Sequence, residues 1–312
     1  MPESVASFVL AIHGGAGVIE RDQLSAEDAA AIHADLQAAL DAGGKVLANG
    51  GSALDAVQTA VVALEESPRF NAGKGAVYTA DGAHELDASV MEGHTRRAGA
   101  VAGARTVRNP VVLARAVMEH SSHVLLMGEG AERFADTRED IERVDNDWFD
   151  TETRHAQLRQ EQLREREQAA SLKGAYFGTV GAVALDLHGH LAAATSTGGM
   201  TNKRFGRVGD SPLIGAGNWA DERVAVSGTG WGEFFIRCAV AHDIAARMAY
   251  GSATLEAAAD AVVMQAVPAL GGDGGAIAVD AQGNIALPFN TSGMYRGWIA
   301  RDGSRGTAIF RD

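Results

Sequence analysis

The first third of the chain alternates apolar runs with segments patterned for helices. Residues 4–12 form a continuous apolar stretch that predicts a buried strand, and residues 13–17, His-Gly-Gly-Ala-Gly, predict a glycine-rich turn. Ser25 and Asp28 have the spacing of a capping box and predict the start of a helix. Ser52 predicts the start of a second helix, whose apolar positions recur on one face.

The middle of the chain changes from apolar to highly charged. Residues 73–91 alternate turn signals with short strands, and Asn109 followed by Pro110 predicts a capped helix that runs to about residue 120. Residues 136–168 are dense in Glu, Asp, Arg and Gln and have almost no large apolar side chain after Phe149. This composition predicts either a solvated helix or a disordered linker, which we take to cover about residues 136–177.

The apolar pattern resumes after Gly178. We expect two hairpins, a further strand and two helices, at residues 179–187 with 191–195, 276–279 with 284–287, 223–227, 234–250 and 255–267. Strands therefore gather in two blocks, each accompanied by a pair of helices, and neither block has enough strands to close a core. The pattern predicts one α/β domain over residues 1–312, a sandwich with largely antiparallel sheets and helices outside.

Composition limits the classes of binding partner that we expect for this chain. The chain is 46% hydrophobic and 21% charged, as in an ordinary globular protein, and its net charge of −13 disfavours binding to nucleic acid or to an anionic membrane. The single cysteine, Cys238, excludes an intrachain disulfide. We find no secretion signal and no run of eighteen apolar residues, so we expect a cytoplasmic protein.

Gly178-Thr179 carries the most informative chemistry. Thr179 stands at the mouth of a predicted buried strand, directly after the charged segment. If the chain were cut before Thr179, its hydroxyl would be a nucleophile and its new α-amino group, with an ordinary pKa of about 7.7–8.0, would be the base. Gly178 has no Cβ and would let that hydroxyl approach its carbonyl. Locally, an ordinary strand residue after a turn glycine is the simpler interpretation.

Other candidate residues lie nearby in the second half of the chain. Thr197 and Thr229 adjoin glycines, so their hydroxyls and the neighbouring amides could reach a ligand, although a turn threonine is the common alternative. Arg207 and Asp210 lie in a loop rich in Gly and Pro and could bind the carboxylate and ammonium of an amino acid, or could form a surface ion pair. His120 and His123 lack a third metal ligand, and no glycine cluster completes a phosphate loop or a dinucleotide fingerprint.

Taken together, these motifs resemble the plant-type L-asparaginase / isoaspartyl aminopeptidase family of N-terminal nucleophile hydrolases. The resemblance covers nearly the whole chain, and its most specific parts are residues 70–75 (Phe-Asn-Ala-Gly-Lys-Gly), 85–89 (Glu-Leu-Asp-Ala-Ser), 178–186, 195–202 and 206–212. It implies an αββα sandwich that cuts itself at Gly178–Thr179 into an α subunit (1–178) and a β subunit (179–312). The two subunits are expected to pair as a dimer of heterodimers. The implied substrates are small molecules, namely β-aspartyl dipeptides and L-asparagine.

The resemblance also implies roles for individual residues and no cofactor for catalysis. Thr179 would be nucleophile and base, and Thr197 would hold its hydroxyl. Arg207 and Asp210 would bind the substrate's carboxylate and ammonium, Thr229 and Gly230 would form the oxyanion site, and Asn71 would support the site and position water. A structural sodium ion would be held by backbone carbonyls, for which the matching residues are Leu64, Glu65, Ser67, Phe70, Ala72 and Lys74.

Two other functions stay open. A glycosylasparaginase would share the fold and the nucleophile, but that group usually has Asp where this chain has Gly178. The chain could also be a noncatalytic amino-acid-binding protein on the same scaffold. Trp231 stands where relatives often carry a smaller or polar residue, and it could narrow the pocket and alter the substrate range.

Overall fold

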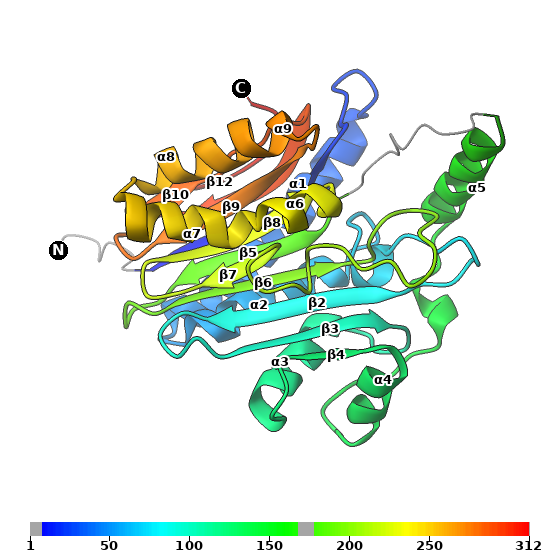
Figure 1. Ribbon diagram of the computed structural model, residues 1–312, viewed down its shortest axis with the longest axis horizontal. Coiled ribbons are helices and arrows are strands. Elements are labelled where there is room, and N and C mark those ends of the chain that lie inside the picture. The colour runs from blue at the N-terminus through cyan, green and yellow to red at the C-terminus, as the bar shows by residue number, and fades with distance from the viewer. Residues whose placement is uncertain (1–7, 168–177, 312) are drawn as a thin grey trace.

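The computed structural model describes residues 8–167 and 178–311. Within these ranges the chain forms two β-sheets packed face to face, with helices on both outer sides (Figure 1). All strand pairs within the two sheets are antiparallel except β3 with β4. The predicted α/β fold with largely antiparallel sheets is therefore confirmed.

The larger sheet combines strands from both ends of the chain. In the described ranges it has eight strands in the order β12-β11-β1-β5-β6-β2-β3-β4. Their bounds are β12 (Arg305–Ala308), β11 (Gly293–Ile299), β1 (Val9–Gly17), β5 (Val180–Leu185), β6 (Leu191–Thr197), β2 (Leu86–Glu92), β3 (Ala98–Ala104) and β4 (Leu125–Met127). The N-terminal β1 lies between β11 and β5, so the centre of the sheet joins segments about 170 and 280 residues apart in sequence.

The smaller sheet comes entirely from the second half of the chain. Its four described strands are β10 (Ile285–Ala286), β9 (Gly274–Asp280), β8 (Val224–Gly230) and β7 (Asn218–Ala220), in that order. It packs on β1, β5 and β6 of the larger sheet and, through β7, also on β2.

Helices on the larger sheet begin where the sequence predicts. Ser25 accepts a hydrogen bond from the Asp28 amide at the start of α1 (Ala26–Ala48), and Ser52 does the same for α2 (Ala53–Glu65). Pro110 begins α3 (Pro110–His120), but Asn109 makes no side-chain cap and donates instead to Glu66. The remaining helices are η1 (Gly73–Gly75), α4 (Gly128–Asp136), η2 (Asn146–Phe149), α5 (Glu152–Glu167), α6 (Gly232–Cys238), α7 (Val240–Gly251), α8 (Leu255–Asp260), η3 (Ala261–Ala266) and α9 (Val267–Ala269).

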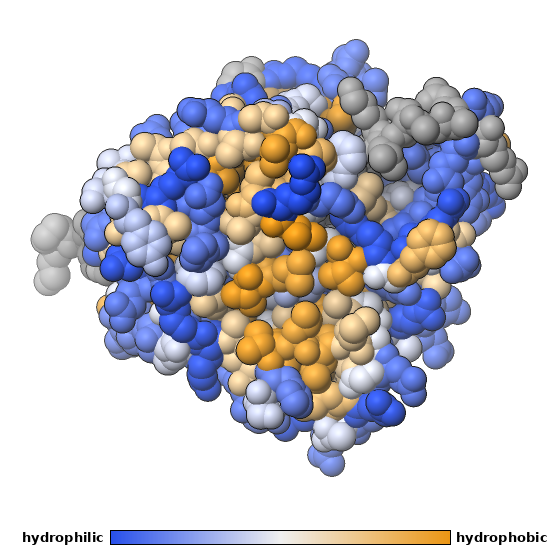
Figure 2. Space-filling view, viewed as in Figure 1, coloured by the Kyte–Doolittle hydropathy of each residue, from blue (hydrophilic) through white to orange (hydrophobic). Residues whose placement is uncertain are grey.

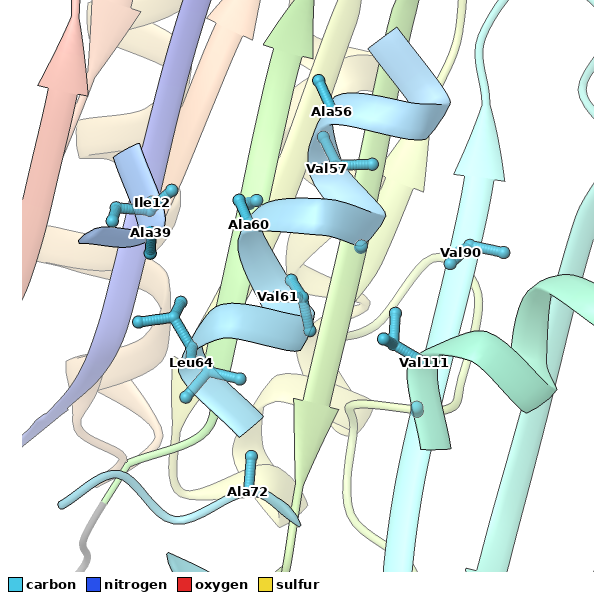
Figure 3. Packing of buried hydrophobic residues seen from close by; sticks show 14 of the residues in the cluster. Ile12, Ala39, Ala56, Val57, Ala60, Val61, Leu64, Ala72, Val90 and Val111 are labelled. Atoms are coloured by element: carbon cyan, nitrogen blue, oxygen red, sulfur yellow. The ribbon is translucent and has the colours of Figure 1, made fainter. Parts of the chain in front are cut away.

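The alternation of side chains along β1 fills two cores at once. Leu10 and Ile12 face the helices and join a core with residues of α1 and α2, where Val57, Val61 and Leu64 point toward the strands (Figure 3). Val9 and Ala11 face the opposite way, into the core between the two sheets. A third core lies between the smaller sheet and the helices α6 to α8. The site described below lies at one end of the middle core, between the sheets.

The predicted glycine-rich turn at residues 13–17 is wrong. These residues continue β1, and the pairing with β11 shifts register between His13 and Gly15. A bulge lets a strand absorb an extra residue without reversing direction, and the glycines that indicated a turn serve this bulge.

The predicted helix at residues 234–250 is two helices. Ala239 adopts a left-handed conformation, φ 48°, between α6 and α7. Alanine gives no break signal in sequence, so the periodic pattern concealed the corner. The predicted helix at 255–267 is also irregular, because its second half forms a π-helical turn, η3.

The charged segment forms an α-helix over part of its described length. Residues 168–177 of the proposed linker lie outside the described residues, but α5 covers Glu152–Glu167, and its surroundings are strongly hydrophilic in Figure 2. Its first turn is anchored by the buried Arg154, which donates to the carbonyls of Gly75 (2.6 Å) and Arg69 (3.2 Å). Within the described ranges, no helix is long and apolar enough to cross a membrane.

Candidate active site

The sheet places two threonines side by side. Thr179 lies just before β5, and Thr197 ends β6, the strand that pairs with β5 through Val180 and Ser196. The Thr179 hydroxyl donates to Thr197 Oγ1 at 3.1 Å, and both residues are buried. Thr197 Oγ1 also accepts the Gly199 amide at 3.0 Å, so the position of its oxygen is fixed from two sides.

A small cavity opens beside these hydroxyls. Its wall includes Thr179, Thr197, Arg207, Asp210 and Gly230, five of the residues predicted from sequence, and its volume is about 20 Å³. That is room for about one water molecule. The structure therefore brings the predicted nucleophile and the predicted substrate-binding pair to one place.

The Gly178 backbone fills part of this space. Gly178 lines the cavity, and a Cβ added to it would lie 2.0 Å from Gly15 Cα. The reverse substitution is equally crowded, because a Cβ on Gly15 would lie 2.3 Å from Gly178 Cα. Gly178 thus lies against the bulge of β1 at a distance that only two glycines allow.

Arg207 and Asp210 approach the cavity from a loop. A Cβ on Gly232 would lie 2.7 Å from Arg207 Nη2 and 3.0 Å from Asp210 Oδ1, so the two side chains flank the same point. Arg207 makes a two-pronged ion pair with Glu233, with Nε and Nη2 each 2.9 Å from a carboxylate oxygen. Burial opposes the charge of Arg207, but the hydrogen bonds and charge of Glu233 raise its pKa overall.

Asp210 is the least satisfied charged group in the site. It is buried, and its Oδ2 has no hydrogen-bond partner among residues 8–167 and 178–311. Burial raises the pKa of Asp210 to about 6, against the opposing charge of Arg207. A buried carboxylate oxygen without a donor is suited to accept a cationic ligand group.

Thr229 and Gly230 end β8 on the opposite side, in the smaller sheet. Thr229 Oγ1 accepts the Ala16 amide at 3.1 Å, which leaves its hydroxyl proton available for another acceptor. Gly230 has φ 152°, and a Cβ there would lie 2.4 Å from the Asp273 carbonyl oxygen. Glycine is therefore required at the point where the strand turns past the cavity.

Asn71 lies behind the cavity wall and does not line it. Its Nδ2 donates to the Gly199 carbonyl at 2.7 Å, and its Oδ1 accepts the Val77 amide at 3.0 Å. Both of these partners line the cavity. Asn71 therefore joins two segments of the wall.

The proposed sodium loop presents main-chain oxygens and few side-chain oxygens. A Cβ on Gly75 would lie 2.0 Å from the Phe70 carbonyl oxygen and 2.8 Å from that of Pro68, and one on Gly73 would lie 2.4 Å from that of Glu65. The carbonyl oxygens of Glu65, Pro68 and Phe70 therefore lie close to the backbone of η1.

The side chains of this loop are engaged elsewhere. Glu65 accepts from the Ser196 hydroxyl at 2.6 Å, the Ser67 hydroxyl donates to Asp35 at 2.6 Å, and the Lys74 ammonium donates to the Trp148 carbonyl. No cluster of three His, Cys, Asp or Glu side chains suited to a metal occurs in the described part of the chain. Leu64, Glu65, Ser67, Phe70, Ala72 and Lys74 therefore contribute mainly carbonyls, although Glu65 Oε2 has no hydrogen-bond partner among the described residues.

The structure adds three residues, Ser211, Glu233 and His13, to which we assigned no role from sequence. The Ser211 hydroxyl is 3.5 Å from Thr179 Oγ1, and Glu233 holds Arg207. His13 donates or accepts at two buried contacts, of which one is the Thr179 carbonyl. A histidine before two glycines at the end of an apolar run was the only sequence signal for His13. Glu233 gave none, because its partner is 26 residues away.

Comparison with known proteins is consistent with this geometry. Residues 6–309 match the protein family described as asparaginase. The isoaspartyl peptidase of Escherichia coli is 55% identical, over 97% of this chain and 96% of its own length, and that of Salmonella typhimurium is 55% identical over 97% and 99%. The isoaspartyl peptidase/L-asparaginase of Mus musculus is 42% identical over 92% of this chain and 86% of its own length. With a family match over almost its whole length, this chain belongs to the asparaginase family.

Proposed function

We propose that the protein is a hydrolase that cuts itself between Gly178 and Thr179 and then uses Thr179 to hydrolyse β-aspartyl dipeptides and the side-chain amide of L-asparagine. The observation that carries this proposal is the hydrogen bond from the Thr179 hydroxyl to Thr197 inside a cavity that Arg207 and Asp210 also line. The relatives named isoaspartyl peptidase support the substrate class.

The proposed first step is cleavage of the chain. Thr179 Oγ1 attacks the Gly178 carbonyl carbon, the bond from that carbon to the Thr179 nitrogen breaks, and the nitrogen takes up the hydroxyl proton. The resulting ester is opened by water, which leaves a carboxylate on Gly178 and a free amine on Thr179. The close packing of Gly178 on Gly15 supports this step, because it holds the segment in a position that a larger residue could not occupy.

The proposed catalytic cycle repeats the same chemistry on substrate. The α-amine of Thr179 takes the hydroxyl proton while Oγ1 attacks the β-carbonyl, and the leaving amine or ammonia receives that proton. Water then hydrolyses the β-aspartyl ester and releases aspartate. In the uncut chain Thr197 accepts the hydrogen bond of the Thr179 hydroxyl. Once the new α-amine takes up that proton, Thr197 is assigned to hold Oγ1 by donating its own hydroxyl hydrogen to it.

An oxyanion forms in both half-reactions and needs donors. We assign this role to the Thr229 hydroxyl, which the Ala16 amide holds in place, and to the backbone at Gly230, which lines the cavity. Asn71 supports the wall through Gly199 and Val77 and is assigned the positioning of water.

Substrate recognition is assigned to Arg207 and Asp210. The guanidinium would bind the α-carboxylate, and the unpartnered Asp210 oxygen would accept the α-ammonium. The cavity as it stands is too small for an aspartyl group, and Gly178 forms part of its wall. After cleavage, movement of the new C-terminus at Gly178 away from the cavity would enlarge the cavity.

The proposed architecture follows from the layers. We interpret helices, two sheets and helices as the αββα sandwich of N-terminal nucleophile hydrolases, divided by the cut into residues 1–178 and 179–312. Pairing into a dimer of such heterodimers, in the cytoplasm, remains a proposal. It is supported by exposed Leu125 and Met127 on the edge strand β4 and by the hydrophobic side chains over β3 and β4 in Figure 2. Light scattering at several concentrations tests the assembly.

A structural sodium ion is a further proposal. The carbonyls of the loop from Leu64 to Lys74 would hold it, and the ion would stabilise the segment that positions Asn71. A bound ion raises stability by mass action, so the melting temperature should rise with sodium chloride and not with an equal concentration of choline chloride. Equal curves in the two salts would contradict this proposal.

The decisive experiment replaces Thr179. The Thr179→Ala chain should remain a single polypeptide by intact mass and should release no aspartate from a β-aspartyl dipeptide. Thr179→Ser keeps the hydroxyl and should retain part of both activities. A Thr179→Ala protein that is cut in two and still hydrolyses substrate would refute the mechanism.

The same assay separates the alternatives. We expect turnover of β-aspartyl dipeptides and asparagine, whereas preferred turnover of glycosylated asparagine would favour a glycosylasparaginase. A stable, uncut wild-type chain that binds aspartate without turnover would favour the noncatalytic binding protein. Exchange of Trp231 for a smaller residue would then test whether this side chain limits the substrate range.

A further inference from the structure

His13 connects the two sheets directly behind the nucleophile. It lies in β1 of the larger sheet, has no exposed surface, and its Nδ1 is 2.9 Å from the Thr179 carbonyl oxygen. Its Nε2 is 2.9 Å from Ser227 Oγ on β8, in the smaller sheet. Ser227 Oγ is in turn 2.7 Å from Thr195 Oγ1 on β6. These four residues form one buried chain of contacts.

The neighbouring strand leaves space for this chain of contacts. Gly181 follows Thr179 by two residues in β5, and a Cβ there would lie 2.0 Å from Ser227 Oγ and 2.5 Å from His13 Nε2. The imidazole and the hydroxyl therefore pack directly on the backbone of β5. Any larger residue at position 181 would displace them.

The proton on the His13 ring can be assigned from its partners. The Thr179 carbonyl only accepts, so Nδ1 must carry the hydrogen. Burial lowers the pKa of His13 to about 3, although the Thr179 carbonyl raises it, so the ring is neutral and Nε2 is an acceptor. Ser227 must then donate to Nε2, and Thr195 must donate to Ser227.

The far end of the network is consistent with this direction. Thr195 Oγ1 donates to the Gly217 carbonyl oxygen at 3.1 Å and lies 2.7 Å from Ser227 Oγ, so with Ser227 donating to His13 the single Thr195 proton is shared between these two acceptors. The Gly217 carbonyl is not left without a donor, because the Gly228 amide reaches it at 2.9 Å. The Gly217 amide donates to the Asp210 main-chain carbonyl at 3.1 Å, so the network ends beside the proposed substrate-binding loop.

We propose that His13 is a positioning residue: as the neutral Nδ1–H tautomer it holds the Thr179 carbonyl and thereby fixes the nucleophilic hydroxyl against Thr197 and beside the substrate-binding loop. His13 does not contact the reacting atoms, and its role rests on the proposed function of Thr179. Loss of its contact would let the nucleophile shift without altering the groups that bind substrate.

Two substitutions separate the two sides of the ring. The amide nitrogen of Asn can replace Nδ1, whereas that of Gln lies closer to the position of Nε2. His13→Asn should therefore keep much of the wild-type kcat. His13→Gln and His13→Ala should lower kcat about 10- to 100-fold with little change in KM, because misplacement of reacting groups acts on the chemical step. Gly181→Ala should displace the His13 imidazole and should therefore lower kcat as His13→Gln does. His94→Asn, on an exposed hairpin, is the matched control with unchanged kinetics.

Kinetics should be expressed per cleaved chain, measured by intact mass. If a variant cuts itself too slowly to yield enough mature enzyme, its rate of self-cleavage is compared in place of kcat, because the same hydroxyl performs both reactions. The proposal is supported if the rate, of turnover or of self-cleavage, is highest in the wild type, somewhat lower in His13→Asn, and lowest in His13→Gln and His13→Ala. Equal loss in Asn and Gln at equal melting temperatures, or a loss confined to KM, would overturn it.

The tautomer gives a test that does not depend on turnover. Nitrogen-15 NMR of the wild-type protein should show His13 neutral with the proton on Nδ1 from about pH 5 to 9, the opposite of the usual preference for Nε2–H. A proton on Nε2, or an imidazolium in this range, would overturn the proposal. A wild-type chain with this tautomer and no hydrolytic activity would instead refute the function proposed for Thr179.

Discussion

The two sides of the candidate site are built in different ways. Thr179 and Thr197 stand at the ends of paired strands in the centre of the larger sheet, and their hydroxyls bond to each other and to the Gly199 amide. Arg207 and Asp210 stand on a loop between strands. Arg207 is partly exposed and paired with Glu233, and one Asp210 oxygen has no hydrogen-bond partner among the described residues.

This difference indicates that the groups proposed for the chemical step are held rigidly, whereas the groups proposed to bind substrate can adjust. A nucleophile needs sub-ångström placement, and a hydrogen-bonded sheet between two cores supplies it. A recognition site needs free bonding capacity until the substrate arrives, and a loop with an unsatisfied carboxylate supplies that. Substitutions on the sheet side should therefore act on kcat, and substitutions on the loop side on KM.

Removal of the Thr197 hydroxyl should have the largest effect. Thr197→Val keeps the shape but leaves the Thr179 hydroxyl and the Gly199 amide without their shared acceptor. We expect kcat to fall about 100-fold with KM nearly unchanged, since the nucleophile loses its orientation. Steady-state kinetics on a β-aspartyl dipeptide check this, with Thr137→Val, at an exposed position, as control. A change in KM alone would break the proposed division between the two sides.

Loss of the guanidinium should come next. Arg207→Ala removes the charge-assisted partner of the substrate carboxylate, which is worth about 1.5–3 kcal/mol, or roughly a 10- to 150-fold rise in KM. Arg207→Lys retains the charge without the two-pronged geometry and should fall between. An Arg207→Ala enzyme with a KM close to wild type would contradict the carboxylate role.

Acid should weaken product binding through Asp210. Burial raises the pKa of this carboxyl to about 6, so below that pH the free enzyme carries a neutral Asp210 that no longer attracts an ammonium. The inhibition constant of L-aspartate should therefore rise about tenfold per pH unit below about 6 and level off above it. The Asp210→Asn enzyme should bind L-aspartate weakly, and its inhibition constant should no longer rise as the pH falls. A pH-independent inhibition constant in the wild type would exclude the ammonium role.

The smallest effect is expected at Glu233. Its carboxylate holds Arg207 from a half-exposed position, and such ion pairs contribute about 0.2–1 kcal/mol. Glu233→Gln should raise KM by no more than about fivefold and leave kcat unchanged. A large loss of kcat would mean that the loop, and not only the sheet, positions the nucleophile.

Local signals in the sequence predicted the local parts of the fold. Ser25, Ser52 and Pro110 mark helix starts because caps act within one turn. The β11 strand was not predicted, since its partner β1 is some 280 residues away and its residues do not alternate strictly. The corner at Ala239 was also invisible, because tertiary packing imposed a conformation that the residue itself disfavours.

The site divides in the same way. Thr179, Thr197, Arg207 and Asp210 lie in short motifs beside glycines, and the resemblance of these motifs to a known family, not their local spacing, made them candidate site residues. The network of His13, Ser227 and Thr195 is not recognisable in this way, because strand order in two sheets brings these residues together and no spacing along the chain encodes that order. Sequence thus proposed the candidate reacting groups, and the structure shows the contacts that hold them.

The position of β1 between β5 and β11 has a consequence for the life of the protein. A cut before Thr179 assigns β1 to one polypeptide and both of its neighbours to the other. The two chains would then share one sheet, so separating them would require breaking the strand pairing of β1 with both of its neighbours. Refolding of the cleaved protein would then be a bimolecular association whose rate depends on concentration. The uncut chain, in contrast, forms the same strand pairs within one molecule by closing a loop. Such a protein is expected to be durable once matured and slow to recover after denaturation, so that for the cell its maturation runs in one direction.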